Sequence, residues 1–101
     1  MFGDPVRSSD RYFTVLARSN GGDGARLGLT ISRRVAKNAV DRNRLKRLAR
    51  ESFRLQTSLA ACDFVVLAKA GAADAERAPL RESLDRHFAR LSAQISAAGH
   101  G

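Results

Sequence analysis

The stretch SRRVAKNAVDRNRLKRLARESFR, residues 32–54, decides how the rest of the chain is organised. Between Arg33 and Arg54 it holds nine of the chain's eighteen Lys and Arg residues, opposed only by Asp41 and Glu51. This segment therefore carries a net charge of +7, whereas the whole chain of 101 residues carries +8. So concentrated a positive charge creates a local field whose natural counterpart is a polyanion.

The same stretch has the pattern of an amphipathic helix. Asn38 is a favourable N-cap, and Asp41, three residues later, is placed to complete a capping box. At 100° per residue, one arc is apolar, with Phe53 at its edge: Leu45, Leu48, Ala49, Ser52 and Leu55. The opposite arc is basic and is flanked by Arg42 and Arg44: Asn43, Lys46, Arg47, Arg50 and Arg54. A merely solvated helix face would interleave Glu with these cations. We therefore expect the apolar arc to pack on a core and the basic arc to meet phosphates.

Length and composition bound the possibilities. The 101 residues predict a single domain, and 44% hydrophobic residues suit a folded chain. A pI near 11.2 favours nucleic acid as partner, with an anionic membrane surface second. The sequence has neither an apolar run of membrane-spanning length nor the pattern of a signal peptide, which predicts a cytoplasmic protein without a membrane partner. The lone Cys62 predicts neither a disulfide nor a metal site, and we expect it to be semi-buried.

Two segments before the basic stretch alternate between apolar and polar residues. They are residues 12–18 and 26–33, joined by the glycine-rich turn SNGGDGA. The simplest assembly is an antiparallel hairpin with one apolar face for the helix and one small, polar face. The GGDG run lacks the spacing of a phosphate-binding loop, so we interpret it as a hairpin turn.

Two further elements are predicted after the basic stretch. Residues 63–69, DFVVLAK, have the composition of a buried strand, and residues 70–78 read as a small-residue loop. Pro79 suits the first turn of a last helix that ends at Gly99. Its apolar stripe is Leu80, Leu84, Phe88, Leu91 and Ile95.

Candidate catalytic chemistry is nearly missing from the sequence. The two histidines, His87 and His100, have no Ser, Cys or acid at a recognisable nucleophile spacing. The carboxylates are scattered, so no magnesium site is predicted in the protein itself. We expect His87 to be a surface residue. If the protein takes part in phosphodiester cleavage, the reacting groups come from elsewhere.

The run from Asn38 to Arg54, with its core RNRLKR at residues 42–47, resembles the RNR signature of the protein component of bacterial ribonuclease P. Residues 26–34, RLGLTISRR, resemble the strand that precedes the signature in that family. Residues 63–69 resemble the strand that follows it. The resemblance covers the chain from about Phe2 to the last helix.

This resemblance implies a protein that binds a catalytic RNA and assists removal of the 5′ leader from precursor tRNA. The RNA performs the chemistry with bound Mg²⁺, and the protein binds no cofactor of its own. The positions that match the family's catalytic-RNA site are Arg33, Arg34, Lys37, Asn38, Arg42, Asn43, Arg44, Lys46, Arg47 and Arg50. The positions that match its leader groove are Phe2, Thr14, Leu16, Thr30 and Ser32. No obligate protein partner is implied.

The implied fold is α+β, with a mixed sheet of about four strands and helices packed on one face. The family joins the strands before and after the signature helix by a left-handed βαβ crossover, against the general right-handed rule. Family members begin with a basic, Phe-containing helix, which this sequence largely lacks, since Phe2 aligns with its final part. Either the start codon lies further upstream or the leader groove lacks one wall. We expect this chain to bind the catalytic RNA but to discriminate weakly between leader-bearing and mature tRNA. Leu16 stands where some members have Tyr, and residues 97–101 are expected to fray.

Two other classes of protein fit the same residues. A ribosomal or other structural RNA-binding protein would use a basic helix on a sheet equally well, and an independent endonuclease would act without an RNA partner. A helix that lies on acidic lipid fits less well, because the core needs its apolar arc. Assays of precursor-tRNA cleavage with and without the bacterial catalytic RNA separate the three RNA-directed possibilities.

Overall fold

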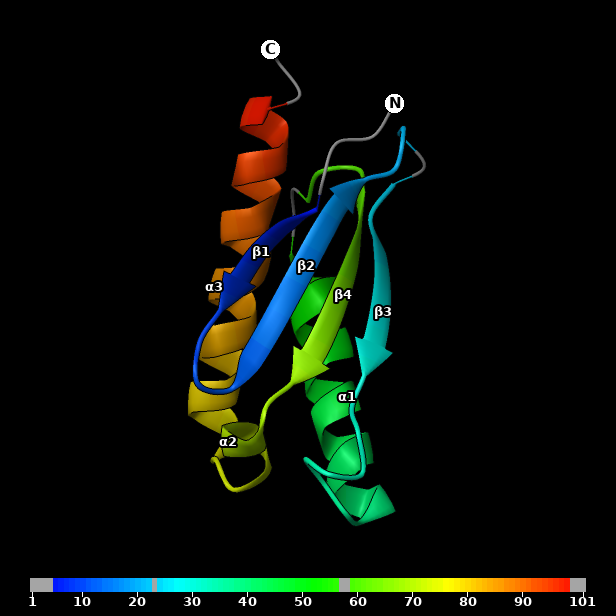
Figure 1. Ribbon diagram of the computed structural model, residues 1–101. Helices are drawn as coiled ribbons and strands as arrows, with labels where there is room; N and C mark the ends of the chain where they lie inside the picture. Colours follow the sequence, from blue (N-terminus) through cyan, green and yellow to red (C-terminus); the bar gives the residue numbers. More distant parts are fainter. Residues whose placement is uncertain (1–4, 23, 57–58, 99–101) are drawn as a thin grey trace.

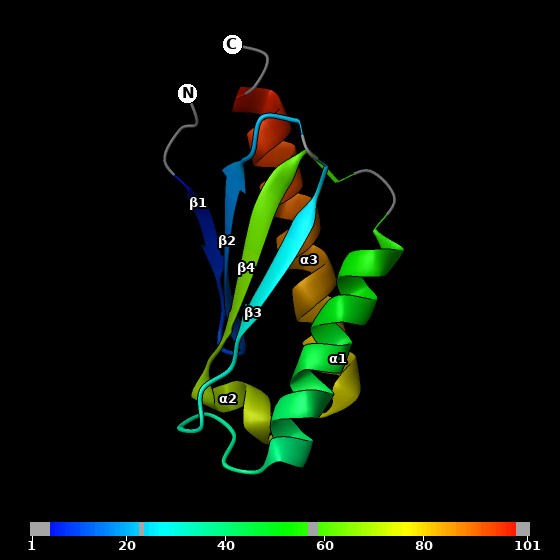
Figure 2. The same cartoon turned by 90° about the vertical axis from the view of Figure 1, so that its right-hand side faces the viewer.

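The computed structural model describes residues 5–22, 24–56 and 59–98 (Figure 1). Its elements follow in the order β1 (Val6–Ser9), β2 (Phe13–Ser19), β3 (Arg26–Thr30), α1 (Ala39–Leu55), β4 (Cys62–Ala68), α2 (Ala70–Ala73) and α3 (Arg77–Ala98). The strands form one sheet in the order β1-β2-β4-β3. Helices α1 and α3 lie side by side on one face of this sheet, and the other face is open (Figures 1 and 2). The predicted α+β architecture is confirmed.

The connection from β3 through α1 to β4 is a left-handed crossover. β3 and β4 are parallel neighbours, with Leu29 aligned with Val66. In Figure 1, β3 runs downward at the right edge, α1 returns upward behind the sheet, and β4 runs downward to the left of β3. That path turns with the left hand, whereas about 98% of such units turn with the right. The handedness that the family resemblance implied is confirmed.

The predicted hairpin between residues 12–18 and 26–33 is wrong. Both segments are strands, but β4 lies between them and pairs antiparallel with β2 and parallel with β3. The true antiparallel neighbour of β2 within the first twenty residues is β1, which the sequence did not reveal. The β1 sequence VRSS contains one apolar residue, so it shows no hydrophobic alternation. The short helix α2 was predicted as loop because its sequence, AGAA, gives no periodic signal.

The core lies between the sheet and the two long helices. Alternation in β2 buries Phe13, Val15 and Ala17, as predicted, and β4 adds Phe64 and Val66. The apolar stripe of α3 is confirmed, since its members Leu80, Leu84, Phe88 and Leu91 are fully buried and Ile95 packs at the margin. Phe53, Phe64 and Phe88 meet edge to face, with centroids 5.5–5.9 Å apart. These three rings join α1, β4 and α3.

Three expectations about burial need correction. Leu55, predicted in the apolar arc of α1, is 58% exposed because it is the last residue of the helix and lies past the core. Cys62 is completely buried rather than semi-buried. His87, predicted at the surface, is only 3% exposed because it faces β1 beneath the sheet, where its Nδ1 lies 2.7 Å from Ser8 Oγ.

Candidate nucleic-acid interface

Helix α1 begins at Ala39 with Asn38 as N-cap, as predicted. The capping box does not form, because the Asn38 side chain makes no hydrogen bond to the helix backbone. Its Nδ2 instead donates to Asp41 Oδ2 at 3.5 Å. The start is fixed by the Arg42 N–H, which donates to the Asn38 carbonyl at 3.1 Å, and Asp41 in the first turn favours the helix dipole.

Six cations of the basic stretch are exposed and form what we call the basic ridge: Arg33, Arg34, Lys37, Arg47, Arg50 and Arg54. Within residues 5–22, 24–56 and 59–98, none of the six forms an ion pair or donates a side-chain hydrogen bond to the protein. Asn43 is also exposed and lines a surface hollow with Arg47, Arg50, Arg54 and one acidic residue, Glu51. The ridge therefore presents guanidinium groups that are free to meet an external anion.

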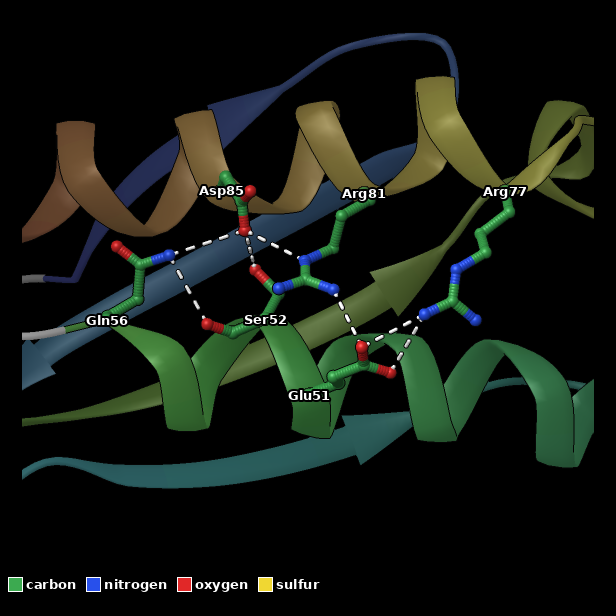
Figure 3. Close-up of polar contacts among 6 residues, drawn as sticks. All are labelled: Glu51, Ser52, Gln56, Arg77, Arg81 and Asp85. Atoms are coloured by element: carbon green, nitrogen blue, oxygen red, sulfur yellow. Dashed lines mark hydrogen bonds and ion pairs between the residues drawn. The ribbon is translucent and has the colours of Figure 1, made fainter.

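Glu51, the acidic residue that lines this hollow, is paired with two arginines of α3. Glu51 accepts bonds from Arg77 Nη2, at 2.9 and 3.2 Å, and from Arg81 Nη1, at 3.0 Å (Figure 3). Although desolvation acts in the opposite direction, these two α3 arginines lower the pKa of Glu51. Arg81 also binds Asp85, which accepts a short hydrogen bond from the buried Ser52 (Figure 3). This network fastens α1 to α3, and it pairs the Glu51 carboxylate with arginines of α3 rather than with those of the ridge.

The two arginines that flank the basic arc are bonded within the chain. Arg42 Nη1 donates to the carbonyls of Ala36 and Lys37, both at 2.9 Å. Arg44 donates to the carbonyls of Ala73, at 3.2 Å, and Ala75, at 3.5 Å. Both side chains are half-buried. Arg42 thus holds the loop that carries Arg33 to Lys37, and Arg44 holds the connection between α2 and α3.

The open sheet face carries the predicted groove residues Thr14, Leu16 and Thr30. The register places Val65 between Leu16 and Gly28, and Leu67 between Thr14 and Thr30. The centre of the face is therefore apolar, and the prediction of a small, polar face is wrong. Sequence reasoning missed Val65 and Leu67 because β4 was interpreted as a strand buried on both sides.

The two other residues predicted in the leader groove, Ser32 and Phe2, are not found on the sheet face among the described residues. Ser32 lies beyond the end of β3, where its Oγ accepts the Val35 N–H at 3.3 Å, so it belongs to a turn rather than to the sheet floor. Phe2, which the resemblance aligns with the final part of the family's N-terminal helix, lies outside the described residues. On the β1 side, Arg7 pairs with Leu16, and Ser9 Oγ bonds Thr14 Oγ1 at 2.9 Å. This strand therefore adds a polar border that the sequence did not predict.

Within the described part of the chain, no three His, Cys, Asp or Glu side chains gather into a site for a metal ion. The same residues include no helix long and apolar enough to cross a membrane. A ridge of cations without protein partners among the described residues, together with an open, partly apolar sheet face, is the pattern of a nucleic-acid-binding protein.

Comparison with known proteins assigns the chain to a family. The family described as Ribonuclease P matches residues 1–92. The chain is 50% identical over 93 residues to the ribonuclease P protein component of Thioalkalivibrio sulfidiphilus, covering 91% of this chain and 78% of that protein. Identity to the component of Methylococcus capsulatus is 47% over 97 residues, covering 95% and 76%. The chain therefore belongs to the ribonuclease P protein family, whose members are components of a ribonucleoprotein of tRNA processing.

Solved structures agree with this assignment. The RNase P protein of Staphylococcus aureus superposes with a TM-score of 0.78 at 30% identity, covering 87% of this chain and 84% of that one. The Thermotoga maritima protein, solved with 1-(4-fluorophenyl)-2-thiourea, gives a TM-score of 0.74 at 30% identity, covering 88% and 85%. The fold is that of the family.

Proposed function

We propose that the basic ridge binds the catalytic RNA of ribonuclease P and that the open sheet face receives the 5′ leader of precursor tRNA, while the RNA carries out the cleavage. The observation that carries this proposal is the set of six exposed cations without partners in the described residues, five of which are arginines. Arginine forks bind phosphates in a bidentate manner, which suits a folded RNA backbone.

The spacing of the ridge supports contact with successive phosphates. Arg47, Arg50 and Arg54 lie at i, i+3 and i+7 of α1, so they share one helix face. Each neutralised phosphate releases counterions, and log affinity then falls with log salt by roughly 0.7–0.9 per phosphate. Arg42 and Arg44 serve the same interface indirectly, by fixing the loops on either side of the ridge. Lys46 and Asn38 complete its margins.

The open face supports the leader proposal. Leu16, Val65 and Leu67 form an apolar centre, and Thr14 and Thr30 border it with hydroxyl groups. Single-stranded nucleic acid binds where bases find apolar or aromatic surface and the backbone finds polar groups. Gly28, opposite Val65, adds no side chain at the β3 edge of the face. The surface suits an extended strand of nucleotides better than a duplex.

The distribution of nucleophiles supports a protein that supplies no reacting atom. Ser8, His87 and Asp10 form a Ser-His-acid chain, with Ser8 Oγ 2.7 Å from His87 Nδ1 and Asp10 Oδ2 3.1 Å from His87 Nε2. Ser8 is 6% exposed and His87 is 3% exposed, so a phosphodiester has no access to either side chain. This cluster ties β1 to α3. We expect the Mg²⁺ of the reaction to be held by the RNA.

The decisive experiment is precursor-tRNA cleavage with and without a bacterial ribonuclease P RNA at low Mg²⁺. We expect the protein to stimulate cleavage by the RNA and to cleave nothing alone. Arg47→Gln reduces the stimulation, whereas Arg90→Gln, an equal loss of charge on exposed α3 surface, leaves it unchanged. Cleavage by the protein alone would establish a nuclease, and RNA binding without any stimulation would indicate a structural RNA-binding protein.

A further inference from the structure

A second hollow lies on the helix side of the sheet edge, away from the open face. It is formed between β3 and α1 and is lined by Leu27, Leu29, Lys46, Arg50 and Phe53. β3 is the edge strand of the sheet, and α1 runs alongside it (Figure 2). Gly28 and Thr30 of the same strand face the opposite side, so β3 separates this hollow from the proposed leader groove.

The floor of the hollow is apolar and is held rigid. Leu27 and Leu29 are half-buried, and so is the Phe53 ring. This ring packs edge to face against Phe64, at 5.9 Å between centroids, and against Phe88, at 5.6 Å. An aromatic ring that the core fixes while it remains partly accessible offers a flat group a surface at little cost in conformational entropy.

The rim of the hollow is cationic. Lys46 and Arg50 project from α1 on one side, and no lining residue is acidic. Arg50 also lines the hollow shared with Asn43, Arg47, Glu51 and Arg54, so it belongs both to this rim and to the basic ridge. An apolar protein segment in this hollow would remove the charges of Lys46 and Arg50 from water without offering an anion to pair with them, which is unfavourable. A nucleotide brings both the flat base and the phosphate that this combination requires.

We propose that this hollow, the edge slot, receives one unpaired nucleotide of the catalytic RNA, with its base against Phe53, Leu27 and Leu29 and its phosphate between Lys46 and Arg50. The inference rests on the proposed function, because it needs RNA on the ridge. A base inside a duplex is stacked and cannot enter the slot, so the occupant comes from a bulge, loop or junction. The slot thereby adds recognition of RNA shape to the charge of the ridge.

Replacement of Phe53 tests the slot. We expect Phe53→Leu to weaken binding of ribonuclease P RNA by about 5- to 150-fold, the equivalent of ~1–3 kcal/mol of stacking per base. Binding to a fully paired RNA duplex stays unchanged, and so does the salt dependence, because no phosphate contact is lost. Leu55→Ala, which removes an exposed apolar side chain from the same helix outside the slot, is the matched control. Equal affinity of Phe53→Leu and the parent for ribonuclease P RNA would overturn the inference.

Phe53→Trp gives a second measurement, by fluorescence, that does not depend on the stability of the Leu variant. The chain contains no tryptophan of its own, so the emission of this variant comes from position 53 alone. Ribonuclease P RNA should quench the emission of this variant, whereas duplex RNA and a leader oligonucleotide should not. RNA binding without quenching would refute the slot and leave the proposed function intact. Quenching by the leader oligonucleotide would refute the assignment to the catalytic RNA. Failure of the parent protein to bind ribonuclease P RNA would instead contradict the proposed function.

Discussion

Arg44 donates from Nη2 to the carbonyl oxygen of Ala73 at 3.2 Å, so a residue of the basic helix also holds the connection between α2 and α3. Arg47, one turn further along α1, makes no such bond within the described residues and is exposed. The signature segment therefore contains arginines with two different roles. Arg44 positions protein backbone, whereas Arg47 is one of the residues that we propose to contact RNA.

This difference predicts opposite results for the same conservative substitution. Arg44→Lys loses the fork that spans two carbonyls, and we expect it to lower the free energy of unfolding by about 1–3 kcal/mol. Arg47→Lys should change stability by less than about 0.5 kcal/mol, as exposed positions do, but should weaken RNA binding. Urea denaturation and filter binding measure the two effects. Equal stability loss in both variants would show that the Arg44 bonds contribute nothing.

Two leucines of α1 that share the predicted apolar arc should respond differently to truncation. Leu48 is 2% exposed and Leu55 is 58% exposed. Leu48→Ala leaves a cavity beneath the helix and should cost ~2–5 kcal/mol of stability. Leu55→Ala should cost almost nothing, because the side chain is already in water. Thermal unfolding of the two variants compares them, and a large loss for Leu55→Ala would mean that the end of α1 packs more tightly than the structure shows.

Stability should fall in mildly acidic solution because of His87. Burial lowers the pKa of His87 below its ordinary value of 6.5 and outweighs the carboxylate of Asp10, which acts in the opposite direction. Arg86 and Arg90 lower it further. The unfolded chain then binds a proton at this residue before the folded protein does, so stability is present above pH 6.5 and is lost as the pH falls toward the folded pKa.

Urea midpoints measured from neutral to mildly acidic pH test this sign. We expect the parent midpoint to decrease with falling pH and the His87→Gln midpoint to vary less. The pKa of Asp10 is also lowered: burial opposes this shift, but hydrogen bonds from Ser83, Phe13 and Tyr12 outweigh it. Its stabilising contribution is therefore lost only in stronger acid. A parent midpoint that increases as the pH is lowered from neutral to the onset of carboxyl titration would contradict the assignment of a neutral, buried His87.

The sequence predicted where individual helices and strands lie along the chain better than it predicted which strands pair with each other. The basic and apolar arcs, with Asn38 as N-cap, predicted the first residue of α1 correctly. Alternation in β2 correctly separated the buried Phe13, Val15 and Ala17 from Thr14 and Leu16 on the other face. Alternation does not say which strand lies beside which, so the position of β4 between β2 and β3 was not predicted. The burial of His87 was missed for the same reason. It depends on β1, a polar segment that is recognisable as a strand only from its pairing with β2.

Leu16 offers a gain-of-function test of the open sheet face. It lies between Arg7 and Val65 at the centre of that face and is half-buried. Leu16→Tyr adds an aromatic ring on which a base can stack, worth ~1–3 kcal/mol. We therefore expect preference for leader-bearing over mature tRNA to increase about fivefold or more in complexes with ribonuclease P RNA. Leu16→Met, which keeps the apolar bulk without a ring, should leave the preference unchanged. If both variants discriminate like the parent while binding the RNA normally, the leader does not pass over Leu16, and its path must be sought on another surface.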